Sequence, residues 1–124
     1  MMTPEQLVTL AEQEIAEVWK KLPPPLLASA QECPVRILLK PTDKQREEMG
    51  QEADDLLGLF EGSSRLENLA SAEQMPSISL FIEAIWEEAE EDMDIYREEV
   101  KVTYLHELGH YLGWDEDEVE SRGL

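Results

Sequence analysis

The sequence from Tyr104 to Asp117 constrains the fold more than any other part of the chain, because it contains the pattern H-E-x-x-H. On an α-helix this pattern places His106 and His110 about 40° apart in rotation and about 6 Å apart along the axis. Two imidazoles on one helix face can reach the same metal ion, and neutral imidazole is a common zinc ligand. Glu107 lies about 100° around the helix from His106, so its carboxylate can reach a metal-bound water. We therefore expect His106 and His110 to bind Zn²⁺, with Glu107 as the catalytic base.

The residues after this helix contain the predicted third metal ligand. Gly113 suits the left-handed conformation that ends a helix and turns the chain back. Four acidic residues, 115–118, lie just beyond it. The spacing of the longer motif, H-E-x-x-H-x-x-G-x-x-(ligand), selects Glu116, which would leave the fourth position of a tetrahedral zinc ion for water. Spacing alone leaves Asp115 and Asp117 as alternatives.

The surroundings of the motif argue against a chance match on a surface helix. Both histidines of the chain lie inside the motif. Apolar residues cover most of the helix circumference, so we expect this helix to be central and buried on several sides. Buried imidazoles and a buried carboxylate need partners, and a metal ion would supply one. The apolar positions are Val102, Leu105, Leu108 and Leu112.

With these residues the chain resembles the small bacterial zincin-like metallopeptidases, which carry H-E-x-x-H-x-x-G-x-x-D near the C-terminus of a minimal zincin fold. The resemblance covers most of the chain and includes Leu56–Gly62, which is similar to the family's glycine-punctuated segment. Glu116 is a departure, because the family usually has Asp there. The resemblance implies that the strand at Ile78–Ile82 is an edge strand beside the metal-binding helix, where an extended peptide can add as a further strand.

The rest of the chain predicts the scaffold of one α+β (α/β two-layer) domain over residues 1–124. An N-terminal helix begins after Thr3, which forms a T-x-x-Q capping box with Gln6. Apolar residues then repeat at helical spacing as far as Leu22, and the prolines at 23–25 stop the helix. With a three-stranded sheet and the C-terminal metal-binding helix, this is a minimal zincin-like domain.

The sheet is predicted from three short apolar runs. These are residues 35–39, 56–60 and 78–82, the last with a possible continuation to Ile85. Gly58 marks a bulge or a close backbone approach within the second run. The connections are expected to be loops, and they are residues 41–55, with a helical turn near 44–49, and 63–77.

The segment 83–99 carries nine acidic residues and one basic residue. Its central run, residues 87–94, is predicted to be a solvated linker or a frayed helix start, with a docking surface for basic substrates as the alternative. Asp92 or Asp94 is expected to cap the metal-binding helix.

Charge and cysteine content restrict the partners and the compartment. The formal net charge of -19, from 29 acidic and 10 basic residues, disfavours nucleic acid and anionic membranes as partners. It would favour basic peptides, although it is also explained by solubility alone. Cys33 is the only cysteine, and no apolar run is long enough to cross a membrane. We expect a cytoplasmic protein without a membrane-spanning segment.

The predicted function is that of a zinc metallopeptidase that hydrolyses peptide bonds in a peptide or protein substrate, and the negative charge is compatible with a basic one. The alternative is a non-catalytic metal-binding interaction module with a zincin fold, because only eight residues follow Glu116 and little remains to wall a deep pocket. A metal-free acidic interaction protein is a third interpretation, which the intact motif disfavours.

Several further residues have two interpretations. Tyr104 or Tyr111 can donate a hydrogen bond to the oxyanion, but buried tyrosines more often belong to the core. Asp94, Glu98 and Glu99 are candidate hydrogen-bond partners for the histidines, and the sequence does not choose among them.

Overall fold

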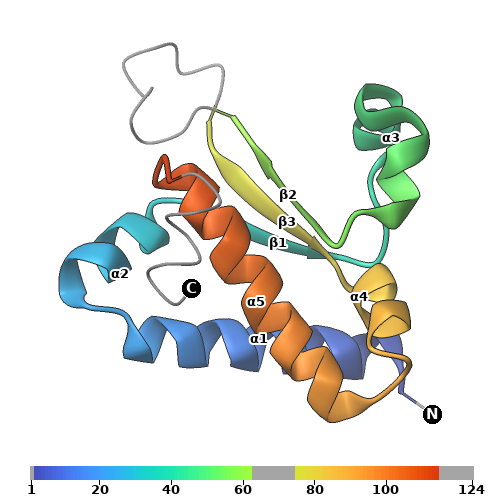
Figure 1. The fold of residues 1–124 in the computed structure, drawn as a ribbon, viewed down its shortest axis with the longest axis horizontal. Helices are drawn as coiled ribbons and strands as arrows, with labels where there is room; N and C mark the ends of the chain where they lie inside the picture. The colour runs from blue at the N-terminus through green and yellow to red at the C-terminus, as the bar shows by residue number, and fades with distance from the viewer. Residues whose placement is uncertain (1, 63–74, 115–124) are drawn as a thin grey trace.

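The computed structural model describes residues 2–62 and 75–114, in which helices pack against a small mixed sheet (Figure 1). This arrangement confirms the predicted α+β architecture. The elements in chain order are α1 (Pro4–Lys21), α2 (Pro24–Gln31), β1 (Val35–Leu38), α3 (Asp43–Met49), the 3-10 helix η1 (Gly50–Asp55), β2 (Gly58–Glu61), β3 (Ser77–Phe81), α4 (Ile82–Glu88) and α5 (Met93–Tyr111).

The three strands lie in the order β1-β3-β2, so β3 is the central strand. It pairs in parallel with β1, where Val35 lies opposite Ile78, and antiparallel with β2, where Gly58 lies opposite Leu80. The prediction that Ile78–Ile82 is an edge strand is therefore wrong. The physical reason is burial: residues 78–81 of β3 are completely buried, which suits a strand covered on both sides. The edge strand in contact with α5 is β2.

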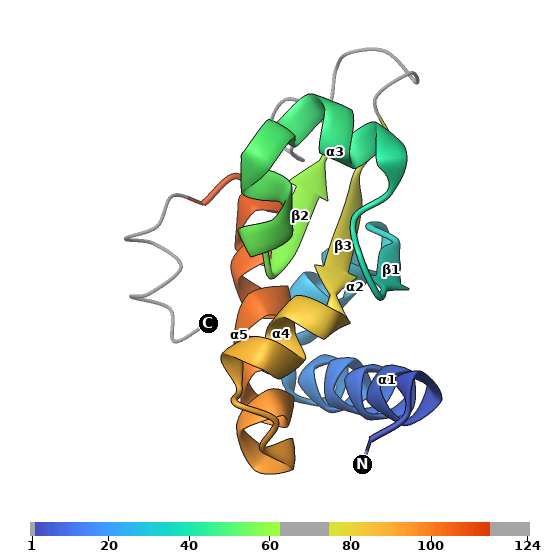
Figure 2. The ribbon, with the colours of Figure 1, turned by 90° about the vertical axis from the view of Figure 1, so that its right-hand side faces the viewer.

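The core lies between the sheet and the helices α1, α4 and α5. Ile78 and Leu80 point into this core, whereas Ser79 points to the opposite face, where the Gln45 side-chain amide donates to its hydroxyl over 3.2 Å. Gln45 belongs to α3, so α3 covers part of the second face. Figure 2 shows α3 and α1 on opposite sides of the sheet.

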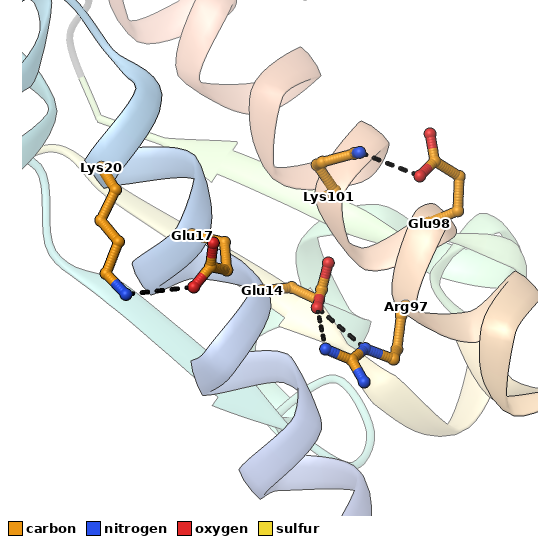
Figure 3. Close-up of polar contacts among 6 residues, drawn as sticks. All are labelled: Glu14, Glu17, Lys20, Arg97, Glu98 and Lys101. Carbon is orange, nitrogen blue, oxygen red and sulfur yellow. Dashed lines mark hydrogen bonds and ion pairs between the residues drawn. The ribbon is translucent and has the colours of Figure 1, made fainter.

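Three polar contacts join α5 to α1. The Tyr96 hydroxyl donates to the backbone carbonyl of Leu7 over 2.8 Å, and the Trp19 indole N–H donates to the Tyr104 hydroxyl over 2.8 Å. The Arg97 guanidinium donates to one carboxylate oxygen of Glu14 through Nε at 2.9 Å and lies 2.8 Å from it through Nη2 (Figure 3). These contacts fix the helix that carries the histidine motif against the N-terminal helix.

The N-terminal helix agrees with its prediction, and a second helix, which was not predicted, follows it directly. Thr3 and Gln6 form the expected capping box, and α1 ends before the three prolines. Pro24 and Pro25 then occupy the first turn of α2, a helix that the sequence reading missed. Proline is compatible with this position because a first-turn residue has no N–H bond to lose.

The two connections contain more helix than the sequence predicted. Residues 41–55 were expected to be a loop with a helical turn near 44–49; that turn is confirmed as part of α3, and η1 follows it. Thr42 and Gln45 build a second capping box there, and Gln45 is buried. Residues 87–94 hold the end of α4, a short turn and the start of α5, which agrees with the predicted linker or helix start. The suggested continuation of the third strand to Ile85 is wrong, because α4 begins at Ile82. The buried positions of α4 are Ile82 and Ile85, which the acidic composition of this segment obscured.

The turn between α4 and α5 depends on Glu90 and Glu91, both with positive φ, at 54° and 59°.

Within the described residues, no helix has both the length and the apolar content needed to cross a membrane.

Candidate metal centre

Helix α5 presents the histidine motif, and both of its ends are defined by local contacts. At the start, the Asp92 side chain accepts the backbone N–H of Ile95 over 3.0 Å, as predicted for one of the two candidate caps. At the end, Gly113 has φ of 83°, and the N–H of Trp114 returns to the carbonyl of Gly109 over 2.9 Å. The left-handed glycine turns the chain immediately after the motif, as its position predicted.

The helix is buried on one side and open on the other. Tyr104 and Leu108 are completely buried, whereas Val102 is 46% exposed. The prediction that apolar residues bury the helix on several sides is thus correct for the faces toward α1 and the sheet and wrong at Val102. The half-buried side chains of His106, Glu107 and His110 lie between these extremes. This position keeps the motif open to a substrate while α5 stays anchored in the core.

The two imidazoles are adjacent and nearly perpendicular. Their ring centroids lie 5.2 Å apart, with an interplanar angle of 79°. For two imidazoles on one tetrahedral zinc ion, Zn–N distances of about 2.0–2.1 Å imply ring centroids roughly 5 Å apart. The observed separation of His106 and His110 therefore fits a shared ion, and the donor set of two neutral imidazoles is one that zinc prefers.

A pocket of about 310 Å³ adjoins the motif and is lined by both His106 and Glu107. Its other walls come from Thr103 and Val102 of α5 and from the chain that leads into β2. The complete lining is Asp55, Leu56, Leu57, Gly58, Glu99, Val102, Thr103, His106 and Glu107.

Gly58 explains how β2 and α5 approach closely enough to form this pocket. A Cβ atom on Gly58 would lie 2.7 Å from Cγ2 of Thr103 and 3.3 Å from Cγ of Glu107. The first distance is shorter than real Cβ contacts allow. The missing side chain thus lets β2 lie directly against the helix turn that carries Glu107, in agreement with the close approach predicted at this position.

The predicted third ligand, Glu116, and its alternatives Asp115 and Asp117 lie outside the described residues. Within residues 2–62 and 75–114, no group of three histidine, cysteine, aspartate or glutamate side chains gathers in a way that would hold a metal ion.

The two candidate tyrosines belong to the core, which confirms the interpretation of them as packing residues. Tyr104 is completely buried, and burial raises its pKa, although the hydrogen bond from Trp19 acts in the opposite direction. Tyr111 is 2% exposed, and its hydroxyl lies 3.4 Å from a carboxylate oxygen of Glu32. Neither lines the pocket beside Glu107.

Of the three acidic residues considered as partners for the histidines, the structure brings Glu99 to the pocket wall. Glu98 instead contacts Lys101 over 3.0 Å (Figure 3), and Asp94 is exposed in the first turn of α5. Asp55 and Thr103 also line the pocket, and sequence reasoning missed both. Thr103 carried a usable signal, because it precedes Glu107 by one helical turn and so shares its face.

A family model described as zincin-like metallopeptidase matches residues 30–124. The match includes the whole sheet, the pocket beside Glu107 and the histidine motif on α5. No curated protein matches the chain.

Proposed function

The chain belongs to the zincin-like metallopeptidase family, and on that premise we propose that it is a zinc-dependent peptidase. In this proposal His106 and His110 hold the zinc ion, Glu116 completes the protein ligands, and Glu107 is the general base. The substrate is a peptide or an extended segment of a protein.

The observation that carries the proposal is the juxtaposition of two imidazoles and a carboxylate on the open side of α5. The ring centroids of His106 and His110 are 5.2 Å apart, and Glu107 lines a pocket together with His106. Peptide hydrolysis needs an activated water, a group that removes its proton, and space for the substrate beside both. These residues supply the second and third requirements directly.

A bound zinc ion would supply the first requirement, by lowering the pKa of a water molecule and by polarising the scissile carbonyl. Glu107 accepts the proton of the attacking water and then donates it to the leaving amine, so that the carboxylate is regenerated. Gly58 supports this role because its lack of a side chain lets β2 pack against the Glu107 turn. His106 and His110 lie one helical turn apart on α5, which is anchored to α1. Binding of one ion by both imidazoles would therefore need no movement of the backbone.

The sheet offers a place for the substrate main chain. In the order β1-β3-β2, one side of β2 pairs with β3, and the other side has no strand partner among the described residues. An extended peptide can add along such an edge through backbone hydrogen bonds. The residues that lead into β2 line the pocket with Glu107, so a peptide on this edge would pass beside the catalytic carboxylate.

The experiment that tests this function measures zinc and cleavage in the same preparation, purified without a nickel column. We expect about one zinc ion per chain and chelator-sensitive cleavage of an unfolded protein substrate. His110→Ala should lose both. Glu98→Gln is the matched control, because Glu98 lies on α5 but contacts only Lys101 at the surface, so this variant should keep both.

Two results would count against the proposal. Equal zinc content in the wild type and in His110→Ala would refute the assignment of the metal ligands. Zinc binding by the wild type without cleavage across a broad peptide library would support the non-catalytic interaction module instead.

A further inference from the structure

We infer that the pocket beside His106 and Glu107 is a subsite for a lysine or arginine side chain of the substrate, close to the scissile bond. This inference rests on the proposed peptidase function and adds a substrate class to it. It depends on the acidic and apolar residues that line this pocket.

Two carboxylates from separate elements line this pocket. Asp55 ends the 3-10 helix η1, and Glu99 lies on α5 about two helical turns before His106. Leu56, Leu57 and Val102 supply apolar surface between them, and Val102 is one of the exposed large hydrophobic residues. The pocket therefore combines an apolar wall with negative charge.

The charge in this pocket is not neutralised by the protein. Within residues 2–62 and 75–114, the side chains of Asp55 and Glu99 make no hydrogen bond or ion pair. Three carboxylates of α1 and α5 have basic partners, as Figure 3 shows. Glu14 contacts Arg97, Glu17 contacts Lys20, and Glu98 contacts Lys101.

A long basic side chain matches both properties of the pocket. Lysine and arginine bury their aliphatic stems along apolar surface while the charged end stays at a polar position. Here the stem would lie against Leu56 and Val102, and the cation would lie near Asp55 and Glu99. A cation in this pocket would be attracted by both carboxylates, whereas an acidic side chain would be repelled.

The charge of the whole chain acts in the same direction. A net charge of -19 attracts cationic peptides over long range, although salt screens this attraction beyond about 8 Å at physiological ionic strength. The pocket provides the local component, which is tied to one position of the peptide. A preference that depends on position therefore distinguishes the subsite from general attraction.

The test is peptide binding to zinc-loaded Glu107→Gln, whose lost basicity prevents hydrolysis during the measurement. An uncharged peptide is compared with a series in which one lysine, or one norleucine of similar length, occupies each position in turn. We expect lysine to bind more tightly than norleucine at one position. In the Glu107→Gln background, Asp55→Asn and Glu99→Gln should each lower this lysine-to-norleucine ratio by about threefold to tenfold.

Matched controls separate the pocket from the overall charge. Glu52→Gln also removes one negative charge from η1, but Glu52 is exposed and does not line the pocket, so the ratio should not change. Glu99→Lys leaves one negative and one positive side chain in the pocket, so it should abolish the lysine preference at the same position.

Cleavage of the same peptides by the wild type distinguishes failure of this inference from failure of the proposed function. Cleavage without a position-dependent lysine preference, or with a preference unchanged in Asp55→Asn and Glu99→Gln, overturns the subsite and leaves the peptidase intact. A lysine preference in binding that both variants lose, in the absence of any cleavage, overturns the peptidase and leaves the subsite intact.

Discussion

Replacement of Gly58 by alanine should destabilise the protein through one identifiable contact. The new Cβ atom would lie 2.7 Å from Cγ2 of Thr103, and 3.3 Å from both Cγ of Glu107 and the carbonyl oxygen of Ser79. Insertion of a methyl group into a tightly packed site costs about 1–3 kcal/mol. The unfolded state offsets about 0.4–1 kcal/mol of this cost, because alanine has less backbone freedom than glycine. Taking the middle of each range, we expect the free energy of unfolding to fall by roughly 1.3 kcal/mol.

Shortening the Thr103 side chain should relieve the same contact, and this second variant is the control for the prediction. Thr103→Ser removes Cγ2 and keeps the hydroxyl, at a cost of about 1 kcal/mol for one buried methyl group. Gly58→Ala combined with Thr103→Ser should then be more stable than the sum of the two single changes by at least about 1 kcal/mol.

Urea unfolding of the zinc-free protein, followed by tryptophan fluorescence, measures all four proteins of this cycle. The reasoning is refuted if Gly58→Ala is as stable as the wild type. It is refuted equally if the two changes are additive, because Thr103 would then not be the residue that excludes a side chain at position 58.

Three further predictions concern the third ligand, the helix interface and the cysteine. Glu116→Gln should weaken zinc affinity more than Asp115→Asn or Asp117→Asn does in a competition titration with a chelating dye; a larger effect at either aspartate would move the ligand. Arg97→Ala leaves Glu14, whose side chain is only 12% exposed, without its partner, so it should lower the free energy of unfolding in urea by about 1–2 kcal/mol. Lys101→Ala removes a more exposed ion pair and should cost less than about 0.5 kcal/mol; equal costs would contradict this reasoning. Burial raises the pKa of Cys33 to about 11, so at pH 8 its thiol stays protonated, and a thiol reagent should modify the native protein far more slowly than the unfolded protein; similar rates would contradict the burial.

The sequence was most informative where a local pattern determines local structure. Thr3 and Gln6 predicted the start of α1, Asp92 was one of two candidate caps for α5, and Gly113 has the left-handed conformation that its position required. Each of these features depends on residues three or four positions apart, which a single chain displays directly. The adjacency of His106 and His110 follows from the helix period in the same way.

The sequence was least informative where pairing or burial between distant segments decides the outcome. The sequence of residues 78–81 does not indicate that β3 lies between two other strands, and β3 was therefore wrongly assigned as the edge strand of the sheet. The acidic composition of 83–99 concealed α4 and the start of α5, which bury Ile85 and Tyr96 against the core.

The pocket beside Glu107 was missed for a related reason. It brings Asp55, at the end of a segment predicted as a loop, to residues of α5 that lie more than forty positions further along the chain. Only the tertiary fold creates this contact. Gly58 was the one local sign of it, because it indicated a close approach without identifying the partner.

The most direct test of the central claim is the comparison of wild type with Glu107→Gln for zinc content and peptide cleavage. Glutamine keeps the size of the side chain and removes its basicity, so it leaves the two imidazoles of His106 and His110 in place. We expect equal zinc content in both proteins and a loss of chelator-sensitive cleavage of about 10²- to 10⁴-fold in Glu107→Gln. Equal cleavage by the two zinc-loaded proteins would contradict the role of Glu107 as the general base.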